Sequence, residues 1–153
     1  ANTMQNRKRL PLLLTALMLV FCIALTGCAG RRSVTAEDFS AACETAGFEV
    51  TDASESFDAS VILTALTVTD ESVSAGLFVF ASADSARSNY AQMLSGVKTG
   101  ASGEKFVDSS EYNRFYFSDE SATTLLYRNG ATLLFATGSD TEKLDALVDA
   151  LGV

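Results

Sequence analysis

The chain has 153 residues, of which 48% are apolar, 11 are basic and 19 are acidic, and it contains three cysteines but neither histidine nor tryptophan. Without histidine, a Ser/His/Asp or Cys/His catalytic unit is excluded and the commonest metal ligand is missing. The acidic balance repels phosphate backbones, so we expect no nucleic-acid partner. This length allows one domain once a targeting segment is set aside.

The N-terminal segment has the order of a secretory signal. Residues 5–9 are polar and basic, residues 10–25 carry no charge, and small residues follow. The uncharged run of 16 residues is shorter than the roughly 20 residues that a permanent transmembrane helix requires. We therefore expect a cleaved signal peptide over residues 1–27, with Met4 as the start of translation, rather than a retained membrane helix.

The signal closes on the tetrapeptide Leu25-Thr26-Gly27-Cys28. This sequence resembles the lipobox of bacterial lipoproteins, in which leucine and small residues precede an acceptor cysteine. The resemblance implies that the Cys28 thiol carries a diacylglyceryl group, with fatty acyl chains such as palmitate, and that cleavage leaves Cys28 as the mature N-terminus. Two acyl chains hold a protein stably at a bilayer, so the expected location is the outer side of the cell membrane. A chance cysteine behind an ordinary signal peptide is the alternative.

Two segments are expected after the lipobox. Residues 28–34 form a lipidated tether, and residues 35–153 form a single folded domain with no proline and no internal linker. The domain contains six basic and 19 acidic residues, which gives a net charge of −13.

One cysteine, Cys43, remains in this domain, because Cys22 leaves with the signal and Cys28 is lipidated. A disulfide framework is therefore excluded. Apolar residues recur around Cys43 at the helical spacing i, i+3, i+4, i+7, which predicts a position in the core. The alternative, a reactive thiol, requires an open and positively charged setting, and the next residue is the acidic Glu44.

Helical periodicity and capping residues predict three helices, over residues 35–47, 82–97 and 139–152. The second follows either Ser82 or Asp84, and its apolar face carries Ala86, Tyr90, Met93, Leu94 and Val97. The first opens with Thr35 and Asp38 in a capping box and closes at Gly47, which tolerates a left-handed backbone. The third opens with a second capping box at Ser139 and closes at Gly152.

Alternating β-branched and aromatic residues predict strands over residues 61–69, 73–81, 105–108, 112–117, 123–128 and 131–137, with a possible short strand at residues 48–50. The last two strands are expected to join through a type I′ turn at Asn129-Gly130. Because hairpins dominate, we expect an α+β fold of order α-β-β-α-β-β-β-β-α. It would have an antiparallel sheet of about five to six strands with all three helices packed on one face.

Two motifs of known enzymes occur in one loop. Residues 95–98 read Ser-Gly-Val-Lys and residues 98–100 read Lys-Thr-Gly, as in penicillin-binding proteins and class A β-lactamases. In those enzymes the two motifs lie on separate elements, whereas here one lysine would serve both. The glycine-rich residues 96–103 also lack the Gly-Lys-Ser/Thr ending of a P-loop. A flexible helix-to-strand connection is the favoured interpretation, and we expect no catalytic residues and no cofactor.

Acidic residues at Asp52, Glu55 and Asp58 are spaced by three. Carboxylate oxygens suit hard cations such as Ca²⁺, and a pair of carboxylates could act as acid and base in hydrolysis. No EF-hand pattern accompanies them, so a solvated acidic loop is favoured. These three residues are therefore weak metal candidates, and they would serve the alternative function of a small carboxylate-dependent envelope hydrolase.

The segment 112–117 predicts a partner-binding surface. Alternation places Tyr112, Arg114 and Tyr116 on one face and the phenylalanines on the other, which we expect to face the core. Tyrosine and arginine are enriched at binding hot spots, and Arg128 could join them from a neighbouring strand. Cross-strand pairs without a ligand are the alternative. The favoured function is a non-enzymatic, lipid-anchored module that binds another envelope protein or an extracellular ligand.

Overall fold

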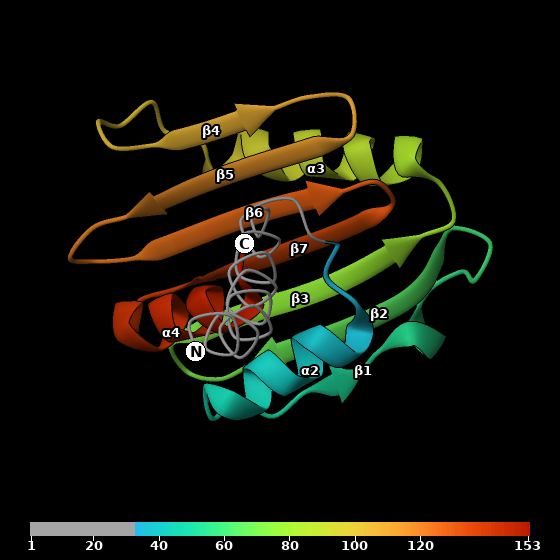
Figure 1. Cartoon of the computed structure of the whole chain (residues 1–153), viewed down its shortest axis with the longest axis horizontal. Helices are drawn as coiled ribbons and strands as arrows, with labels where there is room; N and C mark the ends of the chain where they lie inside the picture. Colours follow the sequence, from blue (N-terminus) through green and yellow to red (C-terminus); the bar gives the residue numbers. More distant parts are fainter. Residues whose placement is uncertain (1–32) are drawn as a thin grey trace, which may run out of the picture. The chain divides into compact units, whose positions relative to one another are not determined.

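A seven-stranded antiparallel sheet organises residues 33–153, the part of the chain that this computed structural model describes (Figure 1). The predicted signal peptide, Cys28 and most of the predicted tether lie outside the described residues. Within residues 33–153, no helix combines the length and apolar character needed to cross a membrane.

The strands are β1 (Thr51–Asp52), β2 (Ile62–Thr69), β3 (Val73–Phe80), β4 (Lys105–Asp108), β5 (Tyr112–Ser118), β6 (Thr123–Asn129) and β7 (Thr132–Gly138). They lie in the spatial order β1-β2-β3-β7-β6-β5-β4. The helices are α2 (Ala36–Thr45), α3 (Ala83–Val97) and α4 (Thr141–Leu151), and a single 3₁₀ turn, η2 (Ser54–Ser56), follows β1. The α+β class and the predicted order of helices and strands are confirmed.

The seventh strand is β1, which lies just beyond the short strand suggested at residues 48–50. Thr51 and Asp52 pair with Thr67 and Leu66 of β2. Phe48 instead turns into the core, where 7% of its surface is exposed. Because Phe48 is buried, pairing with β2 begins at Thr51, three residues later.

The sheet is covered on both faces, so the expectation that all three helices lie on one face is wrong. One buried cluster joins α2 and α4 to Leu125 and Leu134, and a second joins α3 to Phe115, Leu126 and Leu133. In Figure 1, α2 and α4 lie in front of the sheet and α3 lies behind it. The central strands carry unbroken apolar runs rather than clean alternation, which is typical of strands buried on both faces.

The start of the domain follows the predicted capping chemistry. The Thr35 hydroxyl accepts a hydrogen bond from the Asp38 amide at 3.1 Å, and the Asp38 carboxylate accepts one from the Thr35 amide at 3.2 Å. Gly47 adopts a φ of +83° after α2. Val34, which we expected in the tether, is buried in the core with 3% of its surface exposed. The packed domain therefore begins before residue 35.

The predicted N-cap of α4 and the predicted β6–β7 turn each differ from the structure by one residue. Helix α4 is capped by Asp140, whose carboxylate accepts from the Lys143 amide at 3.1 Å, rather than by Ser139. In the β6–β7 hairpin, Asn129 pairs with Thr132, so the central turn residues are Gly130 and Ala131. Of these two turn residues, only Gly130 has a positive φ, at +56°. This pattern fits a type II′ turn with glycine first, and the type I′ turn at Asn129-Gly130 is wrong.

The predicted core position of Cys43 is confirmed. Its side chain is fully buried on the α2–α4 side of the sheet. This burial raises the pKa of the thiol to about 11. Cys43 therefore behaves as a small hydrophobic residue rather than as a nucleophile.

Candidate functional site

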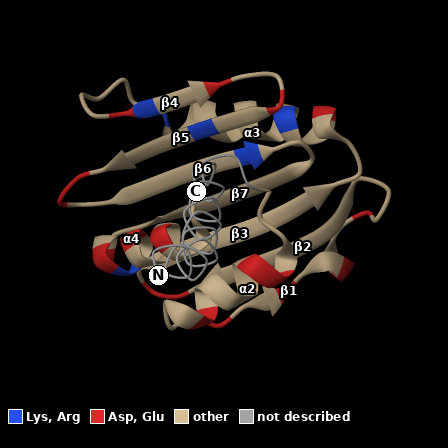
Figure 2. Cartoon of the chain, in the orientation of Figure 1, with Lys and Arg blue, Asp and Glu red and all other residues tan. Residues whose placement is uncertain are grey.

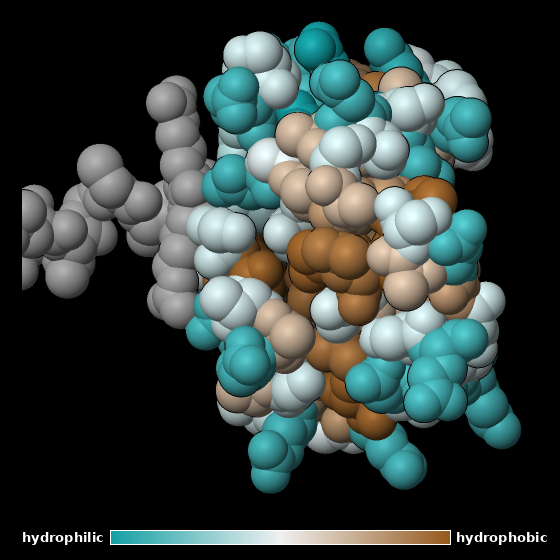
Figure 3. All heavy atoms as spheres, turned by 90° about the vertical axis from the view of Figure 1, so that its right-hand side faces the viewer, coloured by the Kyte–Doolittle hydropathy of each residue, from teal (hydrophilic) through white to brown (hydrophobic). Residues whose placement is uncertain are grey.

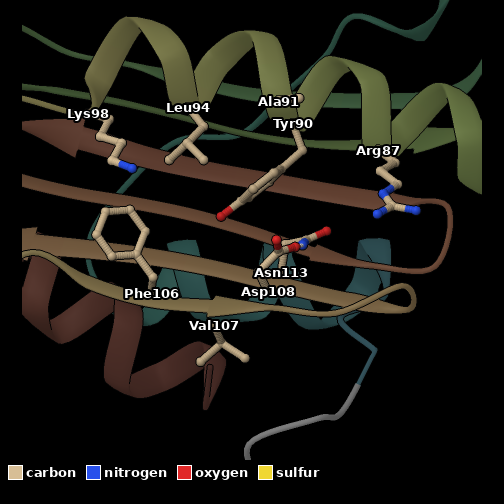
Figure 4. Close-up of a pocket in the computed structure, with 9 residues that line it drawn as sticks. All are labelled: Arg87, Tyr90, Ala91, Leu94, Lys98, Phe106, Val107, Asp108 and Asn113. Atoms are coloured by element: carbon tan, nitrogen blue, oxygen red, sulfur yellow. Dashed lines mark hydrogen bonds between the residues drawn. The ribbon is translucent and has the colours of Figure 1, made fainter.

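A groove of about 430 Å³ lies between α3 and the strands β4 and β5 (Figure 4). Helix α3 makes its main contacts with β6, β3 and β7, whereas every residue of β4 is exposed. The helix therefore leaves the outermost strands of this face open. The groove is lined by Arg87, Tyr90, Ala91, Leu94, Lys98, Phe106, Val107, Asp108 and Asn113.

The end of the groove at the C-terminus of α3 is apolar and capped by a cation. Lys98 Nζ lies 4.7 Å from the centre of the Phe106 ring, which is a cation–π contact. Phe106 also packs on Phe115 at a ring-centre distance of 5.2 Å, yet 46% of its surface remains exposed. Leu94 lies between Lys98 and Tyr90 on the helix side (Figure 4). An apolar ligand group would find contacts at this end.

Tyr90 forms the inner wall of the groove. Only 5% of its surface is exposed, and its hydroxyl points into the groove between α3 and the strands (Figure 4). None of the buried side-chain oxygens or nitrogens in residues 33–153 lacks a hydrogen-bond partner, so the Tyr90 hydroxyl, which bonds to no other described residue, is open to solvent in the groove. Burial, and then the negative charge of Asp108, raises the pKa of Tyr90 to about 12. The hydroxyl thus keeps its proton even at alkaline pH and can donate a hydrogen bond to a bound molecule.

On the strand side of the groove, a series of hydrogen bonds links Arg128 of β6 to Asn113 of β5 and Asp108 of β4. Arg128 is 1% exposed, and its Nε donates to the Asn113 side-chain oxygen at 2.6 Å. Its other two nitrogens donate to the carbonyls of Gly130 at 2.9 Å and Ser110 at 2.8 Å. The Asn113 amide nitrogen in turn donates to the Asp108 carboxylate. This chain fixes Asp108 and ties the β4–β5 and β6–β7 turns together.

Most basic residues of the described chain lie in the segment that forms the groove (Figure 2), although Lys105 and Arg114 share the opposite face of the sheet with Tyr116. Residues 82–130, which include α3 and strands β4 to β6, contain five basic and six acidic residues, whereas the rest of the described chain contains one basic and 13 acidic residues. Arg87 and Lys98 lie at opposite ends of the groove. Burial and the nearby charge of Arg87 lower the pKa of Arg128. An anionic group is therefore repelled by most of the domain and attracted at the groove.

The predicted partner-binding residues do not share one exposed surface. Tyr112 is buried, with 9% of its surface exposed, and packs against the Tyr127 ring at 5.4 Å. Arg128 lies on the opposite face of the sheet, buried under the α3 side. The two corrections have different causes. Alternation does not show which face the helices cover, which decides the burial of Tyr112, and it does not show the register between strands, which places Arg128 opposite Asn113.

The other two predicted residues, Arg114 and Tyr116, lie together but hold the C-terminal helix. The Arg114 guanidinium is 5.2 Å from the Tyr116 ring and donates to the Val153 carbonyl at 3.3 Å. The Tyr116 hydroxyl donates to Asp145 of α4 at 3.0 Å. These contacts attach α4 and Val153 to the sheet, and they are sheet-to-helix contacts rather than the cross-strand pairs of the alternative.

The weak metal candidates are turn-forming residues. Asp52 and Asp58 each accept a hydrogen bond from the amide of the serine two positions later, at 2.9 Å. Hydrogen bonds from the side chains and amides of those serines lower the pKa of both aspartates. Glu55 lies between them in η2. Nowhere in residues 33–153 do three acidic, cysteine or histidine residues gather closely enough to hold a metal ion.

The enzyme-like motif at residues 95–98 contributes only its lysine to the groove. The Ser95 hydroxyl donates to the Gln92 carbonyl at 2.7 Å inside its own helix, while Lys98 lies over Phe106. The following loop is folded rather than loose, because Glu104 accepts hydrogen bonds from the amide and hydroxyl of Thr99 at 2.8 and 2.9 Å. Ser95 and Lys98 therefore form no nucleophile–base pair.

A second apolar surface lies where β2 begins. Phe57, Val61 and Leu63 are 40%, 44% and 57% exposed. Figure 3, which faces the end of the sheet where β2 begins and β3 ends, shows apolar side chains in its middle and hydrophilic ones around them. Phe57 packs edge-on against Phe78 at 5.8 Å. None of these side chains offers a polar group, so this surface is less specific than the groove.

Comparisons with known proteins do not identify a function for this chain. No protein-family model and no curated protein matches the chain. A GTP binding regulator from Thermotoga maritima aligns with 79% of this chain and 88% of its own, at 13% identity and a TM-score of 0.43. The extracellular domain of PknH from Mycobacterium tuberculosis aligns with 73% of this chain and 69% of its own, at 11% identity and a TM-score of 0.25. Neither similarity is strong enough to support a functional assignment.

Proposed function

We propose that this protein is a non-enzymatic binding module, anchored by lipid at Cys28 to the outer side of a bacterial membrane, and that its ligand occupies the groove between α3 and β4. The anchor rests on the resemblance of residues 25–28 to a lipobox. The binding role rests on the groove itself, into which the Tyr90 hydroxyl points and at whose opposite ends Arg87 and Lys98 lie. The hydroxyl is open to solvent there, so a bound molecule would replace water as its hydrogen-bond partner.

The chemistry of the groove favours binding over catalysis. Asp108, the one carboxylate among its lining residues, accepts a hydrogen bond from Asn113 and is held in place by it. Tyr90 is neutral at pH 7, as an ordinary tyrosine is, and burial raises its pKa further, to about 12. Lys98 is stacked on Phe106 rather than placed beside a nucleophile. These groups offer hydrogen bonds, positive charge and apolar contact.

The alternative of a carboxylate-dependent hydrolase gains no support from the candidate acids. A general acid in glycoside hydrolysis needs a raised pKa. Hydrogen bonds lower the pKa of Asp52 and Asp58 instead, and none of the three candidates lines the groove. Of the two functions, the binding module accounts for more of the observed geometry.

A photo-crosslinking experiment in intact cells tests the proposal. A benzophenone amino acid at Ala91 would face the groove, whereas the same group at the neighbouring Gln92, which is exposed and does not line the groove, serves as the matched control. We expect a discrete adduct from position 91 only, and its loss in the Arg87→Gln, Lys98→Gln background. Equal adducts from both positions, or none from position 91 in a correctly anchored protein, would overturn the proposal.

A further inference from the structure

Strand β4 is an open edge of the sheet directly beside the groove. Within residues 33–153 it is the last strand in the spatial order, and its one partner there is β5. Phe106 and Val107, in the middle of the strand, are 46% and 45% exposed. Open and apolar edges are ready templates for pairing with another chain. From this edge, and resting on the proposed function, we infer that the ligand of the groove is an extended, acidic peptide segment of a partner protein, added to β4 as an eighth strand.

The hydrogen-bond pattern of the β4–β5 hairpin shows which backbone groups are open. The Ser109 amide donates to the Tyr112 carbonyl at 2.9 Å. Because hydrogen-bonded and non-bonded pairs alternate in antiparallel strands, Val107 bonds to β5, and the N–H and C=O groups of Phe106 and Asp108 point away from it. The side chains of these same two residues face the groove in Figure 4, whereas Val107 points away. An added strand would therefore pair beside the groove and direct alternate side chains toward it.

The two cations set the spacing of the acidic residues in this segment. Arg87 and Lys98 are 11 positions apart on α3, which corresponds to about 16 Å along a helix. Residues i and i+4 of an extended strand share a face and lie about 14 Å apart. Carboxylates at i and i+4 would therefore reach both cations. The residue at i+2 would lie opposite Ala91, Leu94 and the Tyr90 hydroxyl, where an apolar side chain fits.

Charge favours a partner protein over a second copy of this chain. Two copies paired through β4 would bring their cationic grooves together, and each domain carries a net charge of −13. An acidic segment, in contrast, is attracted by Arg87 and Lys98 and repelled from the remaining acidic surface, which directs it to the groove. Asp108 lies near the Arg87 end, where the Asn113 amide donates to its carboxylate and the positive charge of the buried Arg128 acts against its negative charge.

The test uses a synthetic peptide, acetyl-Thr-Glu-Thr-Leu-Thr-Glu-Thr-amide, with the full-length lipidated protein in non-ionic detergent. Binding is measured by fluorescence anisotropy of a labelled peptide. We expect saturable binding that weakens by at least about tenfold when both glutamates are replaced by glutamine, or when the protein carries Arg87→Gln and Lys98→Gln. Moving the second glutamate by one position, so that the two acids face opposite sides, should weaken binding to a similar extent.

Backbone methylation of the peptide tests the added strand itself. One set of alternate amides would face β4 and the other would face solvent. N-methylation of one set should abolish binding, and N-methylation of the other should leave it within about twofold. Equal effects of N-methylation at the two sets would show that the peptide does not pair with β4 as a strand. If binding still depended on the charges of the peptide and of the groove, the groove would remain the binding site and the proposed function would stand.

Failure of the peptide and failure of the proposed function give different results. An absence of peptide binding would overturn the acidic-segment inference. The crosslink from position 91 would then show whether the groove holds another ligand in cells, such as a small anionic molecule. Absence of that crosslink as well would overturn the binding site.

Discussion

Arg128 donates a hydrogen bond from its Nε to the side-chain oxygen of Asn113 at 2.6 Å, and so joins β6 to β5 beneath the groove. Asn113 continues the connection to Asp108 on β4. The groove wall and the β4 edge thus depend on one buried guanidinium group. Stability and ligand binding should therefore be coupled through Arg128, although Arg128 itself does not line the groove.

Replacing Arg128 by leucine should destabilise the domain. The substitution leaves Asn113 and the carbonyls of Gly130 and Ser110 without their donor. An unsatisfied acceptor costs about 1–3 kcal/mol, and the turn carbonyls can recover water, so we expect a loss of about 2–4 kcal/mol in the free energy of unfolding in urea. Arg87→Leu, on the exposed surface of α3, is the matched control and should change it by less than about 0.5 kcal/mol. Equal effects of both variants would contradict the role of Arg128.

Tyr90→Phe should separate binding from stability. The variant removes a hydroxyl that has no partner among residues 33–153, so the melting temperature should hardly change while the groove crosslink is lost. Tyr116→Phe is the control, because it removes the 3.0 Å bond to Asp145 and should cost about 0.5–1.5 kcal/mol without affecting the crosslink. If Tyr90→Phe destabilised the protein as much as Tyr116→Phe, the Tyr90 hydroxyl would have a structural partner after all.

Local sequence signals predicted the bounds of the helices and strands well, but they did not predict which face of the sheet each helix covers. Most predicted strand ends agree with the structure within one residue, and the Ser82 and Thr35 caps start α3 and α2. These signals arise from side-chain alternation and helix capping, which act over a few neighbouring residues. The side of the sheet chosen by each helix depends on the whole set of buried side chains. For that reason the position of α3 was not predicted.

The candidate site depended even more on tertiary packing. Tyr90 lay in the predicted apolar stripe of α3, and its burial could be foreseen, but the opening of its hydroxyl into a groove could not. Lys98 attracted attention only through an enzyme-like motif. The burial of Arg128, however, is indicated by the sequence, because Arg128 follows the apolar run Leu125-Leu126-Tyr127 in a central strand. A charge at the end of such a run predicts a buried, hydrogen-bonded group rather than a surface contact.

Cys43 should be inert until the protein unfolds. Burial raises the pKa of its thiol from 9.0 to about 11, so little thiolate forms at mildly alkaline pH and a thiol reagent should not react with the native protein. Denaturation should release one reactive thiol per mature chain, since Cys28 is expected to be blocked by lipid. Detection of a second thiol would argue against the lipid anchor.

The sign of the Cys43 pKa shift also fixes its effect on stability. The folded pKa lies above the unfolded value, so the unfolded chain loses this proton first as the pH rises. The contribution of the neutral thiol is therefore complete below about pH 9 and is lost between pH 9 and 11. Cys43→Ala should remove this dependence. Cys43→Ser should cost about 1–3 kcal/mol more than the alanine variant if its buried hydroxyl finds no partner.

Cys28→Ser should release the protein from the membrane. If the lipobox resemblance holds, the variant loses incorporation of labelled palmitate and no longer partitions into the detergent phase, while the folded domain keeps the same melting temperature. Cys22→Ser, within the predicted signal, is the matched control and should retain both properties. Continued detergent partitioning of the Cys28 variant would show that the hydrophobic run is retained instead of cleaved.

Four aspartates should make the domain sensitive to acid. Each starts an Asp-x-Ser sequence and accepts hydrogen bonds from the serine two positions on: Asp52, Asp58, Asp70 and Asp119. These bonds lower the pKa of all four carboxyls from the ordinary value of 3.8. A lowered folded pKa means that their stabilisation is present above pH 3.8 and is lost as the pH falls through the folded values.

Asp70, in the β2–β3 turn, offers the sharpest test of this acid sensitivity. Its carboxylate accepts from the Ser72 and Val73 amides, both at 2.8 Å, and so fixes the hairpin register. Asp70→Ala should lower the melting temperature at neutral pH and flatten its decline in acid. Asp70→Asn keeps an acceptor for the turn but removes the titrating group, so it should flatten the acid decline with a smaller loss at neutral pH. An unchanged acid decline in both variants would show that this turn does not contribute to acid unfolding.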